Sequence, residues 1–202
     1  IVIAKATEGP TAFLVDLPTN GCRLSKPIPT MLGEPLYSFH LEECRVPADA
    51  LLGAPGEALV EQGRALPVLQ MKQAAREVGV AERALQMSRE YAGQRVTFGQ
   101  PLAGRQQIQW MLVDSALELH LTRLLLYETA WRAEQGENIV SLARMLKLQA
   151  NEMASRVLDR ALQIHGGIGL TTDFPLERWF RQLRAERLEA GTTERLRSAL
   201  AE

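Results

Sequence analysis

The hydrophobic positions beyond about residue 55 recur with the period of an α-helix. Met71, Ala74, Val78, Ala81 and Leu85 are spaced in steps of three and four residues, which predicts a helix that runs to about residue 94. Apolar or small residues with similar spacing predict two more long helices, through Ile108, Leu112, Ser115, Leu119, Thr122 and Leu126, and through Leu142, Leu146, Met153, Val157, Ala161 and Ile164. Short connections at 99–101 and 136–138 favour antiparallel neighbours.

The first 50 residues have a different pattern, with short apolar runs between glycines and prolines. Runs at 1–4, 11–15, 36–41 and 44–46 predict strands, and their close spacing is typical of antiparallel β structure. The fold class is therefore α+β: a partial antiparallel β domain at 1–54, followed by an up-and-down four-helix-type bundle at 55–202. Because the chain begins within a strand and without an initiator Met, we expect it to be the C-terminal part of a longer protein.

The stretch Gln163–Glu194 interrupts the regular helical pattern. The long third helix is predicted to end at Gly166–Gly169, and a shorter helix is predicted from 175 to 187. Thr192 is a good N-cap for a final helix, and Glu194 suits its first turn. Helix ends with free backbone N–H groups bind anions such as phosphate, although ordinary caps without a ligand would explain the same residues.

Composition excludes several functional classes. The net charge of −1 indicates neither a nucleic-acid surface nor a polybasic membrane patch, and no run of apolar residues predicts a transmembrane helix. Two cysteines make no disulfide framework, so a reducing, cytoplasmic location is expected. No metal site is expected, because none of His40, His120 and His165 follows a Glu by three residues. His165 is expected to cap or pack at a helix end rather than act as a base.

A second candidate site lies at the end of the first long helix. Arg95 could bind a phosphate through its guanidinium group, and Phe98 could cover a flat ring. The residues alone equally allow Arg95 to cap its helix and Phe98 to lie in the core.

Three motifs in order closely resemble the acyl-CoA dehydrogenase family: R-x-x-F-G-x-x-L with a following Gln, Q-I-H-G-G-x-G, and G-T-T-E. Residues 39–53 resemble the end of that family's middle β domain, and the similarity extends over the whole chain. The resemblance implies non-covalently bound FAD in a homotetramer, a dimer of dimers. It also implies that the family's N-terminal helical domain and the first half of its β domain are not in this sequence.

The resemblance implies two groups of FAD-binding residues. In the first group, five residues match family residues that meet the FAD of a neighbouring subunit: Arg95, Phe98, Gln163, Gly166 and Gly167. Gln106 matches a Gln that also reaches the flavin nucleotide. Thr192 and Glu194 match positions that contact the cofactor of their own subunit.

The family's reaction removes the α-proton of an acyl thioester with a Glu carboxylate, while the β-hydrogen leaves as hydride to the flavin. The usual position of this base is occupied by Ala190, and Glu189 precedes it. A minority of members carry the base at the position of Leu69. The family's CoA-binding Arg and Asp are matched by Gln70 and Pro67.

Three interpretations follow. In the first, Glu189 is the catalytic base and the protein dehydrogenates an acyl-CoA or related substrate, with an electron-transfer flavoprotein or similar acceptor. In the second, the protein is a flavin-dependent monooxygenase of the same fold that lacks the base. In the third, it is a non-catalytic structural subunit of a hetero-oligomeric dehydrogenase.

Overall fold

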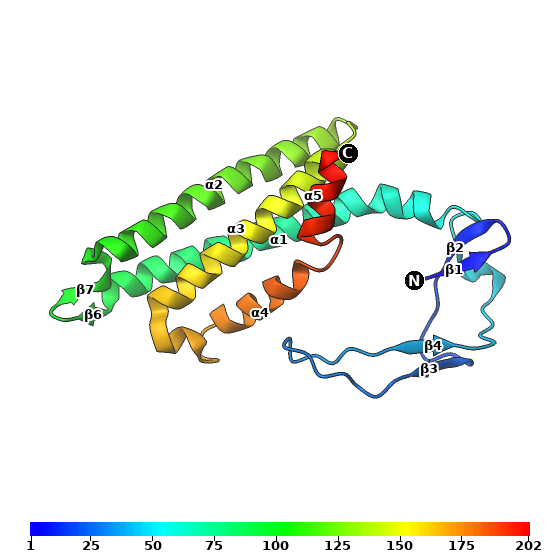
Figure 1. Ribbon diagram of the computed structural model, residues 1–202, viewed down its shortest axis with the longest axis horizontal. Coiled ribbons are helices and arrows are strands. Elements are labelled where there is room, and N and C mark those ends of the chain that lie inside the picture. Colours follow the sequence, from blue (N-terminus) through cyan, green and yellow to red (C-terminus); the bar gives the residue numbers. More distant parts are fainter. The chain divides into compact units, whose positions relative to one another are not determined.

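The computed structural model describes all 202 residues, which divide into two compact units, Ile1–Leu66 and Pro67–Glu202. Helix α1 (Ala58–Gln94) begins in the first unit and continues into the second (Figure 1). The domain boundary expected between residues 54 and 55 stays a prediction.

The first unit is built from short antiparallel strands. Strand β1 (Val2–Ala6) pairs with β2 (Gly9–Phe13), which also pairs with β5 (Leu51–Leu52) after the 3₁₀ turn η1 (Ala48–Ala50). A second sheet joins β3 (Cys22–Leu24) to β4 (Phe39–Leu41). The antiparallel prediction is confirmed. The strand expected at 44–46 is wrong, because this segment has no ladder partner and leads into Pro47, which lacks a backbone N–H.

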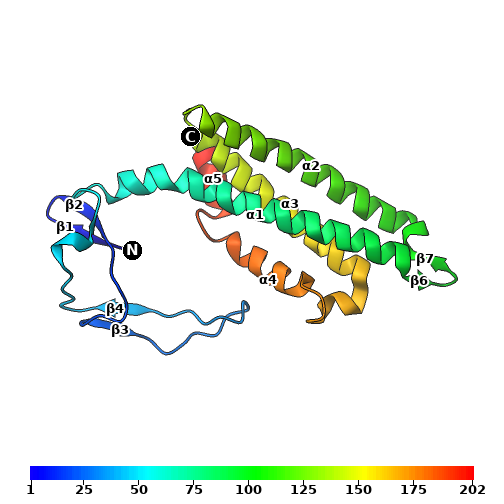
Figure 2. The same ribbon diagram turned by 180° about the vertical axis from the view of Figure 1, so that it is seen from behind.

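The second unit is the helical bundle. Its elements follow in the order α1, β6 (Val96–Thr97), β7 (Gln100–Pro101), η2 (Leu102–Gly104), α2 (Gln106–Glu134), α3 (Val140–His165), η3 (Gly166–Leu170), α4 (Leu176–Glu186) and α5 (Thr193–Ala201). The three long helices run side by side in alternating directions, and α4 completes the group (Figures 1 and 2). Helix α3 is central, since it packs against α2, α4 and α5. The predicted bundle is confirmed.

Small and aliphatic residues from α1, α3 and α4 share one core. Ala81 and Ala84 of α1, Ala154 and Leu158 of α3 and Leu176 of α4 are fully buried and belong to one hydrophobic cluster. A large apolar side chain that leaves water here contributes about 1.5–3 kcal/mol. Helix α1 begins earlier than the pattern predicted, because its first two turns are largely exposed and carry no periodic apolar signal.

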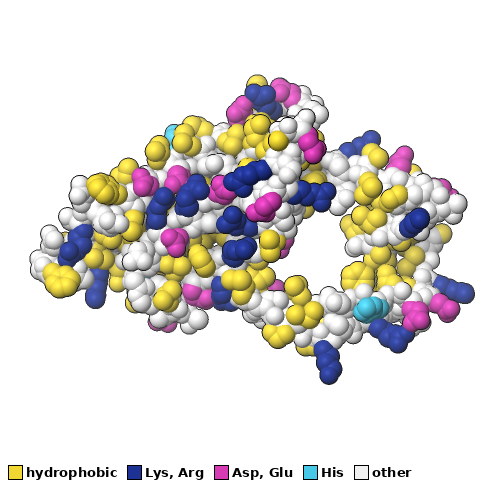
Figure 3. All heavy atoms as spheres, viewed as in Figure 1, with side chains coloured by type: hydrophobic (Ala, Val, Ile, Leu, Met, Phe, Trp, Pro, Cys, Tyr) yellow, Lys and Arg dark blue, Asp and Glu magenta, His cyan; other side chains and the backbone are white.

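Helix α2 leaves one apolar face uncovered within the chain. Hydrophobic side chains gather along this helix at the upper edge of Figure 3. They recur in steps of three and four residues, as Trp110, Val113, Leu117, Leu121, Leu124, Tyr127 and Trp131. Each is more than half exposed. A continuous apolar stripe of this length is typical of a surface that contacts another protein.

Candidate flavin site

The predicted site around Arg95 and Phe98 lies on the hairpin that connects α1 to α2. The Leu102 N–H donates to the carbonyl oxygen of Arg95 at 2.8 Å and closes this connection. The guanidinium of Arg105 donates to the carbonyl and the hydroxyl oxygens of Thr97, at 2.9 and 3.1 Å. Sequence reasoning missed Arg105, although it immediately precedes the motif's Gln106. These bonds fix the tip of the hairpin, where Phe98 lies.

Phe98 does not lie in the core. Its side chain is 97% exposed, its φ is +51°, and the only ring contact is with the Arg105 guanidinium, 5.4 Å from the ring centroid. A non-glycine residue in the left-handed region costs about 1–2 kcal/mol. Burial of the ring within the chain does not offset this cost. An apolar aromatic held out in this way fits a flat external partner, and Arg95 is exposed beside it.

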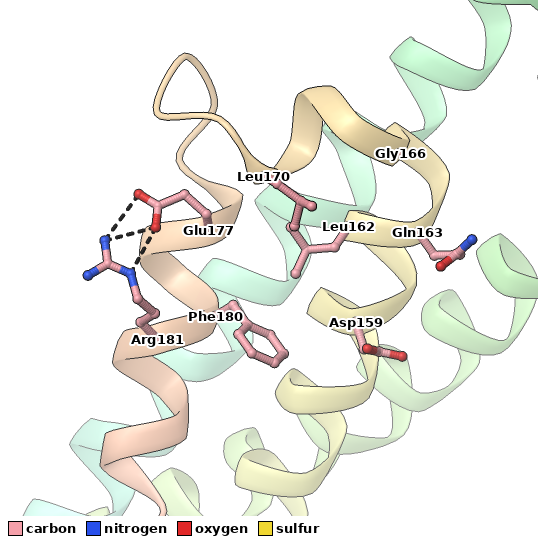
Figure 4. A pocket seen from close by; sticks show the side chains of 8 residues that line it. All are labelled: Asp159, Leu162, Gln163, Gly166, Leu170, Glu177, Phe180 and Arg181. Carbon is pink, nitrogen blue, oxygen red and sulfur yellow. Dashed lines mark hydrogen bonds and ion pairs between the residues drawn. The ribbon is translucent and has the colours of Figure 1, made fainter. Parts of the chain in front are cut away.

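The second predicted site is a pocket at the end of α3. It has a volume of about 430 Å³ and is shown in Figure 4. Leu162, Leu170 and Phe180 form its apolar walls, whereas Gln163 and Gly166 lie on its rim. The remaining lining residues are polar: Asp159, Glu177 and Arg181. The Nε of Arg181 donates to Glu177 Oε2 at 2.8 Å.

The glycines at this helix end keep the backbone open to the outside. Gly166 has a φ of +62°, a conformation that favours glycine, and it ends α3. A Cβ added at Gly166 or Gly167 would meet nothing within 4 Å. The peptide groups beside the pocket are therefore accessible to a ligand that approaches from solvent or from another subunit.

His165 supports this helix end from within. It is 3% exposed, its Nδ1 lies 2.8 Å from the carbonyl oxygen of Ala161, and its ring stacks on Tyr91 at 4.6 Å between centroids. Burial lowers the pKa of His165, which favours the neutral ring. The expectation that His165 packs at the helix end is confirmed.

The third predicted site is the start of α5. The hydroxyl oxygen of Thr192 accepts from the backbone N–H of Arg195 at 3.3 Å, as expected for an N-cap. Thr193 donates to the carboxylate of Glu194 at 2.9 Å. Hydrogen bonds from its own backbone N–H, and then from the two threonine hydroxyls, lower the pKa of the Glu194 carboxyl. A negative charge thus already occupies this helix start, which suits a hydroxyl-bearing ligand better than a phosphate.

The predicted catalytic residues lie on the turn between α4 and α5. The exposed carboxylate of Glu189 accepts from Gln73 Nε2 at 3.3 Å. The carbonyl oxygen of Ala190 accepts from Gln70 Nε2 at 2.8 Å. Gln70, which matches the family's CoA-binding Arg, is 2% exposed and therefore serves this turn from inside the protein. Leu69 is 45% exposed on the same helix.

The structure keeps two groups of predicted residues apart. Gln163 and Gly166 precede α4, whereas Thr192 and Glu194 follow it. The 11 residues of α4 span about 16 Å at 1.5 Å for each residue.

No three residues among His, Cys, Asp and Glu come close enough to hold a metal ion. None of the helices is both long and apolar enough to cross a membrane.

Comparison with known proteins identifies the family. The profile of the acyl-CoA dehydrogenase C-terminal domain matches residues 62–202. The chain belongs to the acyl-CoA dehydrogenase family. (R)-benzylsuccinyl-CoA dehydrogenase of Thauera aromatica is 40% identical over 95% of this chain and 47% of its own length. The chain thus spans about half the length of the curated relatives that it matches.

Solved structures share the fold. Butyryl-CoA dehydrogenase of Megasphaera elsdenii superposes with a TM-score of 0.88 at 28% identity, over 99% of this chain and 54% of that one. The structure of PigA with FAD and proline has a TM-score of 0.88 at 26% identity, over 96% of this chain and 51% of that one. FAD is thus present in a relative with the same fold, in agreement with the cofactor predicted from the sequence.

Proposed function

We propose that this chain is the C-terminal portion of an FAD-dependent oxidoreductase that removes the α- and β-hydrogens of an acyl thioester. Membership of the acyl-CoA dehydrogenase family supports the class of reaction. The observation that supports catalysis by this chain is the exposed carboxylate of Glu189, held on the turn just before Gly191. Acyl-CoA is the proposed substrate class.

The residues present fit FAD. Phe98 offers an uncovered aromatic face, and Arg95 offers a guanidinium group for a phosphate. Gln163 and the open backbone at Gly166 border a pocket large enough for part of a nucleotide. Bound FAD would supply the acceptor for the β-hydride. These residues would hold the cofactor and fix its position.

The two separated groups suit two FAD molecules. We propose that two sets of residues serve the cofactor of a neighbouring subunit. One set lies at the hairpin and the start of α2, and the other lies at the end of α3: Arg95, Phe98 and Gln106, and Gln163, Gly166 and Gly167. Thr192 and Glu194 would contact the cofactor of their own subunit through hydroxyl and carboxylate groups. Helix α4, with 11 residues, separates the two groups along the chain.

The proposed base is Glu189. Its carboxylate has one hydrogen bond, a long one of 3.3 Å from Gln73, so lone pairs remain free to accept the α-proton of a bound thioester. Ala190 has a φ of +51° and Gly191 a φ of +108°. These conformations turn the chain sharply and allow the residue one place before the family's base position to point toward α1.

Oligomerisation would complete the flavin site. The apolar stripe on α2 and the uncovered Phe98 support a homo-oligomer, and we propose the family's homotetramer, a dimer of dimers. Reduced flavin would pass its electrons to an electron-transfer flavoprotein or a similar acceptor.

The decisive experiment is anaerobic reduction of the flavin in the full-length protein. Glu189→Gln is expected to keep the FAD absorbance and to lose bleaching by an acyl-CoA, because an amide cannot accept the α-proton. Glu90→Gln, at an exposed position on α1, is the matched control and should bleach normally. Bleaching by Glu189→Gln at the normal rate would remove Glu189 from the mechanism.

One observation favours a second candidate. The family's two base positions hold Ala190 and Leu69, which have no titratable group. If Glu189 is not a base, the chain would be a subunit or flavoprotein without dehydrogenase activity. Purified material that lacks flavin and needs a co-expressed homologue would indicate the structural subunit. Oxygen consumption with NADH, without bleaching by thioesters, would indicate a monooxygenase.

A further inference from the structure

The turn Glu186–Ala190 carries one large apolar side chain, and that side chain faces solvent. Leu188, at its centre, is 62% exposed, and Ala190 has a φ of +51°. A non-glycine residue in this region persists only where surrounding contacts determine the backbone strongly. Those contacts are polar in this protein, and they come from α1 and α3.

Three residues on one face of α1 contact the turn. Gln70 donates to the carbonyl oxygen of Ala190 at 2.8 Å, and Gln73 donates to the carboxylate of Glu189 at 3.3 Å. Arg76 forms an ion pair with the carboxylate of Glu186. Their spacing of three residues places them on successive turns of the helix. This side of α1 therefore contacts the turn at its first residue and at its last two.

Lys147 of α3 contacts the turn from inside the protein. Its ammonium group is fully buried and donates to Glu77 Oε1 at 3.2 Å, to Asn151 Oδ1 at 3.2 Å and to the backbone oxygen of Glu186 at 3.1 Å. The same Glu186 oxygen accepts from the backbone N–H of Glu189 at 3.1 Å. A single carbonyl group thus joins the buried ammonium to the residue that carries the proposed base.

This polar network does not satisfy all of its buried atoms with protein partners. Four of them have no hydrogen-bond partner within the chain: Gln73 Oε1, Glu77 Oε2, Asn151 Nδ2 and Glu186 Oε2. Buried ion pairs can often be replaced by well-packed apolar residues without loss of stability. An apolar side chain at position 147 could fill the space, but it could not hold a carbonyl oxygen in a fixed place. The arrangement therefore favours control of geometry as the role of the network.

We propose that Lys147 is a positioning residue: through the backbone oxygen of Glu186 it fixes the turn Glu186–Ala190, and so the place of the Glu189 carboxylate. The proposal rests on the role of Glu189 given under the proposed function. Gln70 and Gln73 complete the positioning from α1. Lys147 does not touch the substrate, so its effect would pass through the turn alone.

The test compares two variants with a control in the full-length, FAD-bound protein. Lys147→Met keeps the length of the side chain and removes all three hydrogen bonds. The double variant Glu77→Gln with Lys147→Met also removes the buried carboxylate, so that the protein can fold without an unpaired charge. Arg160→Met is the matched control, because Arg160 lies on the same helix but donates to Glu118 on α2 at 2.8 Å.

Hydrogen exchange of the amides in 187–191 measures positioning without any assay of activity. Loss of a hydrogen bond of ordinary strength predicts about fivefold to tenfold faster exchange in the double variant. Amides in the core of α3 should keep their protection, and the control should leave 187–191 unchanged. Exchange in 187–191 at the normal rate would overturn the proposal, whatever the activity.

Flavin reduction by an acyl-CoA then connects the turn to catalysis. A small displacement of a catalytic group costs on the order of 100-fold in rate, so the double variant should reduce slowly while KM and FAD content stay normal. If Glu189→Gln abolishes flavin reduction but the double variant reduces at the normal rate, the positioning role is overturned. If Glu189→Gln also reduces normally, the proposed base fails instead, and the exchange result alone decides whether Lys147 fixes the turn.

Discussion

The buried carboxyl of Glu77 predicts an unusual pH dependence of stability. Glu77 is fully buried and has one ionic partner, Lys147, at 3.2 Å. Burial raises the pKa of Glu77 from 4.5 to about 7, although Lys147 and Arg76 oppose the rise. Burial likewise lowers the pKa of Lys147. The folded protein therefore prefers the protonated form of Glu77 over part of the range in which the unfolded chain is ionised.

The sign and size follow from linkage. Between pH 4.5 and about 7 the folded state binds a proton at Glu77 that the unfolded state has released, so stability falls as the pH rises. At about 1.4 kcal/mol for each unit between these two pKa values, the loss is about 3 kcal/mol and is complete slightly above pH 7. Glu77→Gln imitates the protonated side chain and should lack this loss.

Denaturant unfolding followed by circular dichroism, at pH 5, 6, 7 and 8 and fixed protein concentration, measures the effect. Relative to wild type, Glu77→Gln should gain about 2–3 kcal/mol of unfolding free energy between pH 5 and 8, because a small part of the loss already occurs below pH 5. Glu90→Gln, exposed on the same helix, should show a difference from wild type that does not change with pH. A constant difference for Glu77→Gln would refute the reasoning, because the buried carboxyl would then titrate as in the unfolded chain.

Three further variants and one control test the packing, the cofactor site and the oligomer. Leu176→Ala empties a fully buried position and should lower the unfolding free energy by about 2–5 kcal/mol in denaturant melts, whereas Leu188→Ala, at an exposed position, should change it by less than about 0.5 kcal/mol. Phe98→Ala should leave stability within about 0.5 kcal/mol of wild type and reduce the FAD content of purified protein; full FAD content would contradict the proposed contact. Leu121→Glu places a charge on the apolar stripe of α2 and should give smaller particles in light scattering, while an unchanged mass would exclude this face as an interface.

Sequence pattern predicted the bundle well because its core is repetitive. Val78 and Ala81 of one predicted series and Leu119 of the next lie in one buried cluster, and the predicted end of α1 at Gln94 is correct. The pattern failed where few contacts determine the structure. The expected strand at 44–46 found no partner.

Apolar character alone could not place Phe98. A phenylalanine next to a helix end is usually buried, and nothing in its local sequence predicts a ring that is 97% exposed at positive φ. Only the resemblance of the surrounding motif to a flavoprotein family indicated an external partner. The cation-π contact with Arg105 could not be predicted for a different reason: it depends on how the hairpin brings Arg105 back beside Phe98.

The sequence and the structure answer different questions about the turn at Glu189. The sequence shows that Ala190 has no carboxylate, but it does not show whether a neighbouring residue can replace it. The structure adds that Gln70 holds the carbonyl oxygen of Ala190, while Lys147 holds that of Glu186. A residue between two fixed carbonyl groups has a defined backbone position, although Glu189 stands one residue away from the family's base. This constraint makes a shifted base chemically reasonable, and it predicts that catalysis depends on residues that never touch the substrate.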